Sequence, residues 1–518
     1  MNRAAQLARL AAEPNAWDII VIGGGATGLG TALDAAARGY RTVLLEQSDF
    51  AKATSSRSTK LIHGGFRYLK QGKVSLVRES LHERGLLLRN APHLVHPLPF
   101  IVPAYKWWEK TYYGLGLTVY DKMAGSLGIG STFWLDQAGV QEKLPGINTQ
   151  GLQGGIQYFD GQFDDARLAL TLAQTTEESG GLALNYVRVA QLIKEKDRTV
   201  GVLAEDTETG RTYELRAKSV INATGIFTDD IRRMDNSAVR PLLAVSQGIH
   251  LVLDASFLSS DTALMVPKTD DGRVLFAIPW HGKLLLGTTD IPRPNAELEP
   301  KPLEEEIAYL LEYAARYLAR KPTRADVRSV FTGLRPLVKG GEGALTSTLA
   351  RDHTLVVSDS GLITITGGKW TTYRKMAEDT VNRAIEVAHL EPKPCRTREL
   401  RLYGSMADTD PHEWSSVYGS LGLSVEKVCR ELPDGLEPLH PRLPFRVGEA
   451  LWSAREEMAR TVEDVLSRRL RALLLDASAA VESAPRVAAI LQRELGKDDA
   501  WAEQQVAEFT ALAEAYRL

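Results

Sequence analysis

The stretch Asp18–Gly30, DIIVIGGGATGLG, decides the fold of this 518-residue chain. Its first six residues, DIIVIG, form an apolar run that predicts a buried β-strand. Small residues through Arg38 then predict a helix, and RTVLLE at Arg41–Glu46 predicts a second strand. A strand, a helix and a strand within about 30 residues indicate a parallel β-α-β unit with a right-handed crossover.

The glycine turn between this strand and helix is typical of a dinucleotide site. Gly23, Gly25 and Gly28 follow the pattern G-x-G-x-x-G, which permits a tight turn and a close approach of the backbone to a pyrophosphate. The helix N-terminus adds free N–H groups and the positive end of its dipole. Glu46 ends the second strand, where it would accept hydrogen bonds from the adenosine ribose and repel a 2′-phosphate. The unit therefore favours FAD or NAD over NADP, and a turn without a ligand is the competing interpretation.

Later segments favour FAD over NAD. The run Ala53–Gly65, ATSSRSTKLIHGG, carries hydroxyl groups and small residues that could wrap a pyrophosphate and the edge of a flavin. Gly367–Thr372 forms a further glycine turn, where a helix N-terminus would stabilise a reduced flavin ring. Small residues also close a strand at Asn222–Gly225. An NAD-dependent dehydrogenase is the alternative, and it would hold no yellow cofactor.

Composition limits the class of protein and its surroundings. The chain length suggests two to four domains. Lys and Arg number 62 and Asp and Glu number 65, so the net charge of −3 excludes a strongly basic nucleic-acid binder. Two cysteines, Cys395 and Cys429, are too few for a disulfide scaffold or a Cys-based metal cluster. We therefore expect no metal and a reducing, cytoplasmic location. No apolar run approaches the roughly 18 residues of a membrane span.

Hydrophobic periodicity places the remaining elements. Alternation predicts antiparallel strands at Gly248–Asp254, Val274–Pro279 and Lys283–Gly287, and further strands are predicted at Lys218–Ala223 and, as a buried strand, at Gly361–Thr366. Helices are predicted at Val74–Leu88, Leu303–Tyr317, Thr371–Ala388 and Asp164–Ser179, the last capped by Asp164 or Asp165. Leu98–Ile147 is expected to be irregular with helical pieces. Apolar spacing predicts one long helix at Arg446–Leu475, after a proline-rich stretch that places a domain boundary near residue 395.

These motifs together resemble the FAD-dependent glycerol-3-phosphate dehydrogenase family, within the D-amino-acid-oxidase-like flavoproteins. The resemblance covers nearly the whole chain, and Arg455–Arg469 is similar to the helical domain appended in that family. The segments that carry it are Asp18–Gly30, Thr54–Leu69 (TSSRSTKLIHGGFRYL), Phe163–Leu168 (FDDARL), Ile221–Gly225 (INATG), Ile278–Asp290 (IPWHGKLLLGTTD), Phe331–Leu337 (FTGLRPL), Leu349–Leu355 (LARDHTL) and Gly367–Glu378 (GGKWTTYRKMAE).

The resemblance implies an α/β fold with an added α domain. A Rossmann-like FAD-binding domain would comprise residues 17–95, 150–240 and 340–390. A substrate domain with a mixed or antiparallel sheet would be interleaved with it, at 96–149 and 241–339, and an all-helical C-terminal domain would follow at 396–518.

The resemblance also implies the site residues. The expected substrate ligands are Arg67, Tyr68, Arg335, Arg351 and Lys369, of which Arg335 and Lys369 would also serve catalysis. The expected FAD ligands are Gly23, Gly25, Gly28, Glu46, Thr54, Ser55, Ser56, Lys60, Leu61, His63, Gly64, Val189, Ala223, Gly225, Gly368, Lys369, Trp370 and Thr371.

The activity that the resemblance implies is oxidation of sn-glycerol 3-phosphate to dihydroxyacetone phosphate, with hydride passing from C2 to flavin N5. The C2 hydroxyl must lose a proton, for which a neutral imidazole is the natural base. His63 is the first choice and His250 the second, with another basic residue or water as the remaining option. Gln247 stands where many relatives have Lys, so we expect that substrate affinity or flavin polarisation differs.

The electron acceptor is the other open choice. Family dehydrogenases use a membrane quinone and family oxidases use oxygen; the absence of a mid-chain insertion favours the dehydrogenase. Aromatic residues beside lysines in Lys106–Leu117 predict peripheral contact with the inner face of the cell membrane, with a packed cap as the competing interpretation. The basic run Arg468–Arg471 is a second candidate for contact with anionic lipid. A homodimer, an amine or amino-acid oxidase, and a non-catalytic flavin-binding regulatory protein stay open.

Overall fold

The β-α-β unit forms where the sequence predicts it. Strands β1 (Trp17–Ile22) and β2 (Thr42–Leu45) are parallel neighbours, and α2 (Ala26–Ala37) connects them. Ile19 and Leu29 are completely buried between the strand and the helix. The computed structural model describes residues 1–13, 15–69, 72–270, 272–339, 353–407, 409–410 and 413–518.

The first sheet has eight strands and extends this unit on both sides. Its main order is β17-β18-β10-β1-β2-β7, and β8 and β9 form an antiparallel extension of β10. Helix α2 packs against α7 and α10. Of the two predicted caps of α7, the structure has Asp164, whose side chain accepts backbone N–H bonds. The bounds are α1 Arg3–Ala12, α7 Asp165–Glu178, β7 Leu182–Leu184, β8 Val187–Glu195, β9 Arg198–Asp206, β10 Thr212–Asn222, α8 Thr228–Asp235, β17 His353–Val357, β18 Ile363–Gly367 and α10 Tyr373–Val387.

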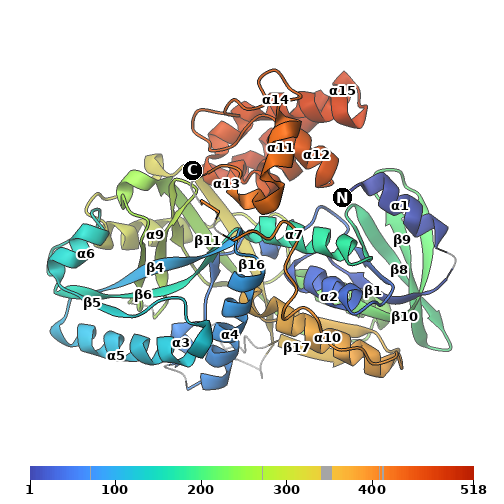
Figure 1. The fold of residues 1–518 in the computed structure, drawn as a ribbon, viewed down its shortest axis with the longest axis horizontal. Helices are drawn as coiled ribbons and strands as arrows, with labels where there is room; N and C mark the ends of the chain where they lie inside the picture. The colour runs from blue at the N-terminus through green and yellow to red at the C-terminus, as the bar shows by residue number, and fades with distance from the viewer. Residues whose placement is uncertain (14, 70–71, 271, 340–352, 408, 411–412) are drawn as a thin grey trace.

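The second sheet has ten strands and forms a separate lobe beside the first (Figure 1). Its order is β15-β11-β14-β13-β12-β4-β6-β3, with β16 paired to β11 and β5 to β6. β11, β13 and β14 are antiparallel, as predicted. The bounds are β3 Leu61–Ile62, α3 Phe66–Leu69, α4 Val74–Asn90, β4 Val95–Ala104, α5 Trp107–Met123, β5 Phe133–Leu135, α6 Gln137–Lys143, β6 Gly154–Phe163, β11 Leu243–Asp254, β12 Ala263–Val266, β13 Leu275–Trp280, β14 Lys283–Gly287, β15 Ile291–Arg293, α9 Glu304–Tyr317 and β16 Ser329–Val338.

The segment Leu98–Ile147 is more regular than the sequence suggests. It contains most of β4, and the 17-residue helix α5 follows. Three prolines obscure β4, but Pro97, Pro99 and Pro103 lie at alternating positions, so their missing N–H groups all fall on the same side of the strand. β4 still pairs with β6 along ten residues.

The division into sheets differs from the expected domain ranges at two places. β6 lies within 150–240 and β3 within 17–95, yet both belong to the second sheet. The reason is their mutual pairing, Ile62 with Gly161, which joins segments about a hundred residues apart. Strand order depends on such non-local pairing, which local sequence patterns do not report.

The predicted long helix at Arg446–Leu475 is wrong. The structure has α12 (Glu449–Glu456), a π-helical turn (Asp464–Arg469) and α13 (Ala472–Leu475) instead. The chain turns at Met458 and Arg471, which both have positive φ angles. The apolar residues whose spacing predicted this helix are nevertheless buried, and all of them except Met458 belong to one hydrophobic core. The other C-terminal helices are α11 Gly422–Cys429, α14 Ala477–Leu495 and α15 Asp499–Ala513.

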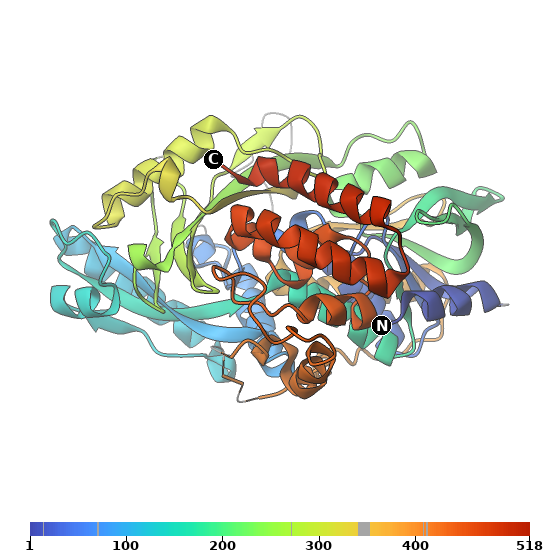
Figure 2. The same cartoon turned by 90° about the horizontal axis from the view of Figure 1, so that it is seen from above.

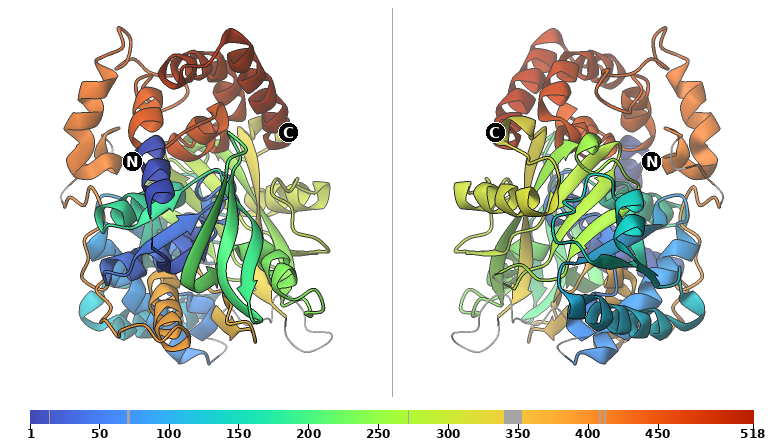
Figure 3. Two further views of the ribbon diagram at one scale, coloured as in Figure 1. Left: turned by 90° about the vertical axis from the view of Figure 1, so that its right-hand side faces the viewer. Right: turned by 90° about the vertical axis from the view of Figure 1, so that its left-hand side faces the viewer.

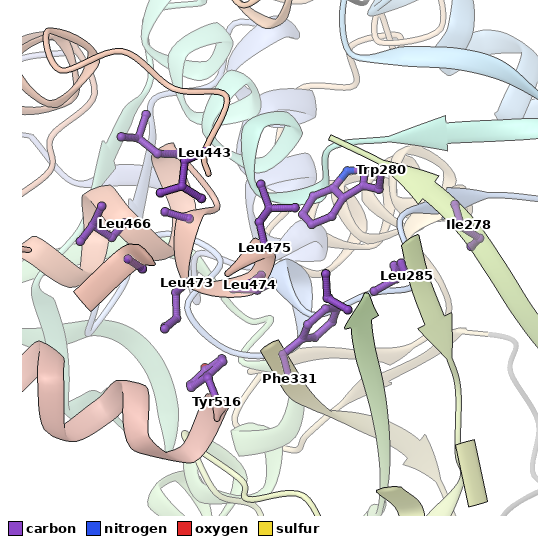
Figure 4. Close-up of a cluster of buried hydrophobic side chains, with 14 of the residues drawn as sticks. Ile278, Trp280, Leu285, Phe331, Leu443, Leu466, Leu473, Leu474, Leu475 and Tyr516 are labelled. Atoms are coloured by element: carbon purple, nitrogen blue, oxygen red, sulfur yellow. The ribbon is translucent and has the colours of Figure 1, made fainter. Parts of the chain in front are cut away.

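The C-terminal helices form a layer over both lobes. Seen from above, α14 and α15 cross the middle of the molecule (Figure 2), and both side views place this layer on top of the sheets (Figure 3). Its hydrophobic core is continuous with that of the second sheet: Leu473, Leu475 and Tyr516 lie near Trp280 and Phe331 (Figure 4). Removal of this layer would therefore expose apolar residues of the sheet.

Candidate active site

The glycine turn is packed too closely to admit side chains. Gly23 has a φ of +109°, and a Cβ there would lie 2.7 Å from the carbonyl oxygen of Ala223. A Cβ on Gly28 would lie 1.9 Å from the oxygen of Gly23. The N-terminus of α2 therefore approaches the ends of β1 and β10 directly, which is the arrangement that a pyrophosphate requires.

Glu46 is fixed beside this turn. One carboxylate oxygen accepts a 2.6 Å hydrogen bond from the Gly24 N–H, and the other accepts a 2.8 Å bond from the Ser48 N–H. Burial raises the pKa of Glu46, and the two N–H groups oppose that rise. The carboxylate thus lies at the end of β2 where ribose hydroxyls are expected.

Ser55 brings the polar run to the same turn. Its hydroxyl accepts a 2.9 Å bond from the Ala26 N–H at the start of α2, and its carbonyl accepts a 2.8 Å bond from the Trp370 indole. Thr54 donates to the Leu334 carbonyl of β16 at 2.7 Å. Three segments that the sequence assigns to the cofactor therefore meet at one helix N-terminus.

The second half of the polar run contacts the last glycine turn. The His63 N–H donates to the Thr371 hydroxyl at 3.2 Å. The Lys369 Nζ lies 4.2 Å from the centre of the Tyr68 ring. A Cβ on Gly65 would lie 2.5 Å from that ring and 3.5 Å from Lys369 Nζ. The structure thus brings His63, Tyr68, Lys369 and Thr371 together, as the site assignment requires.

Arg335 and His250 project from neighbouring strands onto the same face of the second sheet. Arg335 pairs with Ser246 in register, and His250 pairs with Phe331. The Arg335 guanidinium donates to the carbonyls of Gln247 (3.3 Å) and Thr289 (3.0 Å) and lies 3.2 Å from Asp290. These contacts hold a half-buried cation at a fixed position, which suits recognition of a phosphate.

His250 is held rigidly in this face. Its Nε2 lies 2.9 Å from the Thr59 hydroxyl, and its ring stacks on Phe331 with 4.8 Å between centroids. A Cβ on Gly287 would lie 2.1 Å from the His250 ring. Burial lowers the pKa of His250 well below its usual value, and the charges of Lys60 and Arg335 lower it further. The imidazole is therefore neutral at physiological pH.

The side chain of Gln247 lies away from Arg335 and His250. It lies on the opposite face of β11, where its amide donates to the Glu306 carboxylate at 2.6 Å and to the Lys301 carbonyl at 3.0 Å. The sheet separates this side chain from Arg335 and His250, so the described part of the chain shows no direct contact through which it would alter phosphate binding or flavin polarisation.

For the other assigned residues, the structure gives the burial or backbone geometry of some and does not describe Arg351. Val189 on β8 is buried, Leu61 is buried in β3, Gly225 has a φ of +56°, and a Cβ on Gly368 would lie 2.3 Å from Met376 Sδ. Arg67 lies in α3. Arg351 lies outside the described residues, so the structure says nothing of its contribution.

Lys60 is expected to bind FAD, but its side chain pairs with Asp165 in the structure. Its ammonium is completely buried, 2.6 Å from the Asp165 carboxylate and 2.8 Å from the Ser56 carbonyl, and it lies near the rings of Trp280 and Phe331. Burial lowers the Lys60 pKa to about 7, against the opposing effect of Asp165. The Lys60 side chain thus ties the backbone of the polar run, at Ser56, to Asp165.

The basic run Arg468–Arg471 is not a lipid contact. Arg468, Arg469 and Arg471 are at most 3% exposed. Arg468 and Arg469 bind the Asp49 carboxylate, and Arg471 binds Asp165 at 2.8 Å. Sequence reasoning missed this function; the only signal was that the arginines interrupt an apolar segment.

The donor set fits a dinucleotide flavin. The N-terminus of α2 is surrounded by the glycine turn that begins at Gly23, the carboxylate of Glu46 and the hydroxyl of Ser55. The sequence profile of the FAD dependent oxidoreductases matches residues 18–374, and a profile described as the C-terminal domain of alpha-glycerophosphate oxidase matches residues 361–502. The chain therefore belongs to the FAD-dependent oxidoreductases.

Comparisons with individual proteins narrow the class to the glycerol-3-phosphate dehydrogenases, to which this chain belongs. It is 40% identical to the mitochondrial glycerol-3-phosphate dehydrogenase of Rattus norvegicus over 538 residues, which cover 97% of this chain and 73% of the relative. The enzyme of Saccharomyces cerevisiae is 36% identical over 580 residues, covering 95% and 88%.

A solved structure agrees with this placement. The glycerol-3-phosphate dehydrogenase of Bacillus halodurans, complexed with FAD, is 30% identical and superposes with a TM-score of 0.81 over 99% of this chain and 97% of that one. The L-alpha-glycerophosphate oxidase of Mycoplasma pneumoniae, at 16% identity and a TM-score of 0.56, shares the fold. The expected α/β fold with an added helical domain is confirmed.

Proposed function

We propose that the protein oxidises sn-glycerol 3-phosphate to dihydroxyacetone phosphate and uses FAD as the hydride acceptor. The observation that carries this proposal is the fixed Arg335 cation on the sheet face that also presents His250. Its strand, β16, packs against β18 and the 54–56 turn, which supports a place for this cation beside the proposed cofactor site. FAD, when bound, supplies the two-electron acceptor.

Residues of the chain bind the substrate phosphate and remove the proton of its C2 hydroxyl. Arg335 and Lys369 offer positive charge to the phosphate dianion, and Tyr68 lies beside Lys369. A histidine, with His63 as the first choice, takes the proton of the C2 hydroxyl as hydride departs from C2.

The anaerobic visible spectrum of the purified protein tests this function. A flavin spectrum should bleach on addition of sn-glycerol 3-phosphate and stay unchanged with glycerol or with amino acids. Glycerol is the matched control because it lacks only the phosphate that Arg335 is proposed to bind. Bleaching by amino acids would assign the chain to the amine and amino-acid oxidases, and a flavin that no substrate bleaches would favour a regulatory protein.

We also propose a quinone as acceptor and peripheral contact with the cytoplasmic face of the cell membrane. The support is the outer face of α5, where Trp107 is 84% and Leu115 is 67% exposed. Trp108 and Tyr112 are exposed on the same helix, and β5 adds Phe133 and Trp134. Monomeric soluble proteins rarely expose contiguous patches of this kind. Within the described residues, the helices are too short or too polar to cross a bilayer.

The membrane proposal predicts sedimentation with anionic liposomes at low salt. The double substitution Trp107→Ser and Leu115→Ser should release most of the protein to the supernatant, because the apolar contact area is lost. Leu423→Ser is the control, since Leu423 is 83% exposed on α11, in the C-terminal layer. Wild-type protein that stays in the supernatant contradicts the proposal, and a dimer that dissociates only in the double variant would assign the patch to self-association.

A further inference from the structure

The backbone N–H of Gly64, the residue after His63, donates a 2.7 Å hydrogen bond to the hydroxyl of Tyr120 on α5. A Cβ on Gly64 would lie 2.5 Å from the Tyr120 oxygen and 2.7 Å from Leu81. The loop is therefore pressed against this hydroxyl. Only glycine permits such an approach, and a buried N–H needs an acceptor.

Two further buried groups orient the hydroxyl. The Tyr120 O–H lies 2.8 Å from one oxygen of Asp160 and 3.1 Å from the other, so its single proton is directed to that carboxylate. The Arg84 guanidinium donates to Asp160 at 2.7 Å. Tyr120 is 0%, Asp160 2% and Arg84 2% exposed.

The protonation states agree with this direction. Burial raises the pKa of Tyr120 well above its usual value, and the Asp160 charge raises it further, so the phenol keeps its proton. Burial also raises the pKa of Asp160, against the effect of Arg84. A protonated phenol that donates to Asp160 has its lone pairs available for the Gly64 N–H.

The loop is held on both sides of His63. On one side, Ile62 in β3 pairs with Gly161, next to Asp160 in β6. On the other side, Gly64 is bonded to Tyr120, and the His63 N–H itself is bonded to Thr371. The imidazole thus extends from a backbone segment with three fixed points.

We propose that Tyr120, oriented by Asp160 and Arg84, is a positioning residue that sets the His63 loop for the reaction. It touches neither cofactor nor substrate and acts through the Gly64 backbone. This inference rests on the proposed function, because the loop matters to catalysis only if His63 acts there.

The variant Tyr120→Phe tests the proposal, with Tyr158→Phe as the matched control. Tyr158 is also buried, its ring lies 6.3 Å from that of Tyr120, and its hydroxyl bonds Met265 Sδ at 3.0 Å rather than the loop. Both variants should retain FAD. Tyr120→Phe should lower the rate of flavin reduction at saturating substrate by about ten- to a hundredfold with little change in KM, and Tyr158→Phe should match the wild type.

Two readouts separate positioning from a general loss of structure. The peptide spanning residues 61–69 should exchange its amide hydrogens faster in holo Tyr120→Phe and at the wild-type rate in Tyr158→Phe. The pH profile of flavin reduction should also shift only in Tyr120→Phe. Should Tyr120→Phe not fold, Asp160→Asn weakens the acceptor of the Tyr120 proton and should give the same loss.

The outcomes distinguish this proposal from the function on which it rests. If sn-glycerol 3-phosphate fails to bleach the wild type, the proposed function is wrong. If it bleaches the wild type and Tyr120→Phe or Asp160→Asn reacts at the wild-type rate, only the positioning role is overturned. Equal losses in Tyr120→Phe and Tyr158→Phe also overturn it, since they would report packing alone.

Discussion

Asp49→Asn should lower the free energy of unfolding by about 3–5 kcal/mol, the usual cost of removing one partner from a buried ion pair. Asp49 follows β2 and is completely buried, as the arginines opposite it nearly are. Arg469 binds it through two nitrogens, at 2.6 and 2.9 Å, and Arg468 binds it at 2.5 Å. The variant leaves both cations in the interior with fewer acceptors.

The position of Asp49 gives this change a second effect. Asp49 is three residues from Glu46 in sequence, and Arg468 and Arg469 belong to the C-terminal layer. The variant should therefore weaken FAD retention as well as stability, because the segment that carries the ribose acceptor loses its attachment.

Chemical unfolding of holo protein followed by fluorescence measures the first effect, and released flavin measures the second. Asp230→Asn is the control: Asp230 pairs with Arg233 on an exposed face and should cost no more than about 1 kcal/mol. An Asp49→Asn midpoint equal to that of the control contradicts the structural role of the network.

The network also predicts the acid limb of stability. Burial alone would raise the pKa of Asp49, but Arg469 and Arg468 hold it below its usual value. A carboxylate with a lowered folded pKa stabilises the fold above its unfolded pKa of about 3.9, and this contribution is lost as the pH falls below that value. Asp49→Asn should flatten this part of the curve.

His63→Gln should lower the rate of flavin reduction by about 10²- to 10⁴-fold, the usual contribution of a general base. His63 is half-buried and lies in the loop that is bonded to Thr371 and Tyr120. Gln keeps the polarity and approximate size of the side chain and removes its basicity.

His250→Gln is the comparison. His250 is nearly completely buried against Phe331, and burial lowers its pKa well below the usual value, which makes it a weaker base. We expect a smaller loss of rate than in His63→Gln. A larger loss would move the base to β11, where the Nδ1 of His250 has no hydrogen-bond partner among the described residues. If both variants retain FAD and most of the rate, a histidine base is wrong.

The sequence by itself determined the parts of this protein whose physics is local. The apolar run before Gly23, the tight turn at Gly28 and the cap at Asp164 specify a strand, a turn and a helix through neighbouring residues alone. Local pattern also predicted that the hydroxyl-rich run Ala53–Gly65 and the glycine turn Gly367–Thr372 line a cofactor site, and the structure brings Ser55 and Trp370 of these two segments into contact.

Only the tertiary structure decided what depends on distant partners. Gln247 and His250 lie on opposite faces of β11. Which of the two faces borders Arg335 is known only from the tertiary structure. From the sequence, Arg468 and Arg469 could bind either lipid or protein. In the folded chain they bind the buried carboxylate of Asp49, which is more than 400 residues away in sequence. The predicted C-terminal helix is interrupted at Met458 and Arg471, whose positive φ angles the apolar spacing did not indicate. Charge and local pattern limit which contacts a residue can make. The folded chain determines which of them form, because the partners are brought together from distant parts of the sequence.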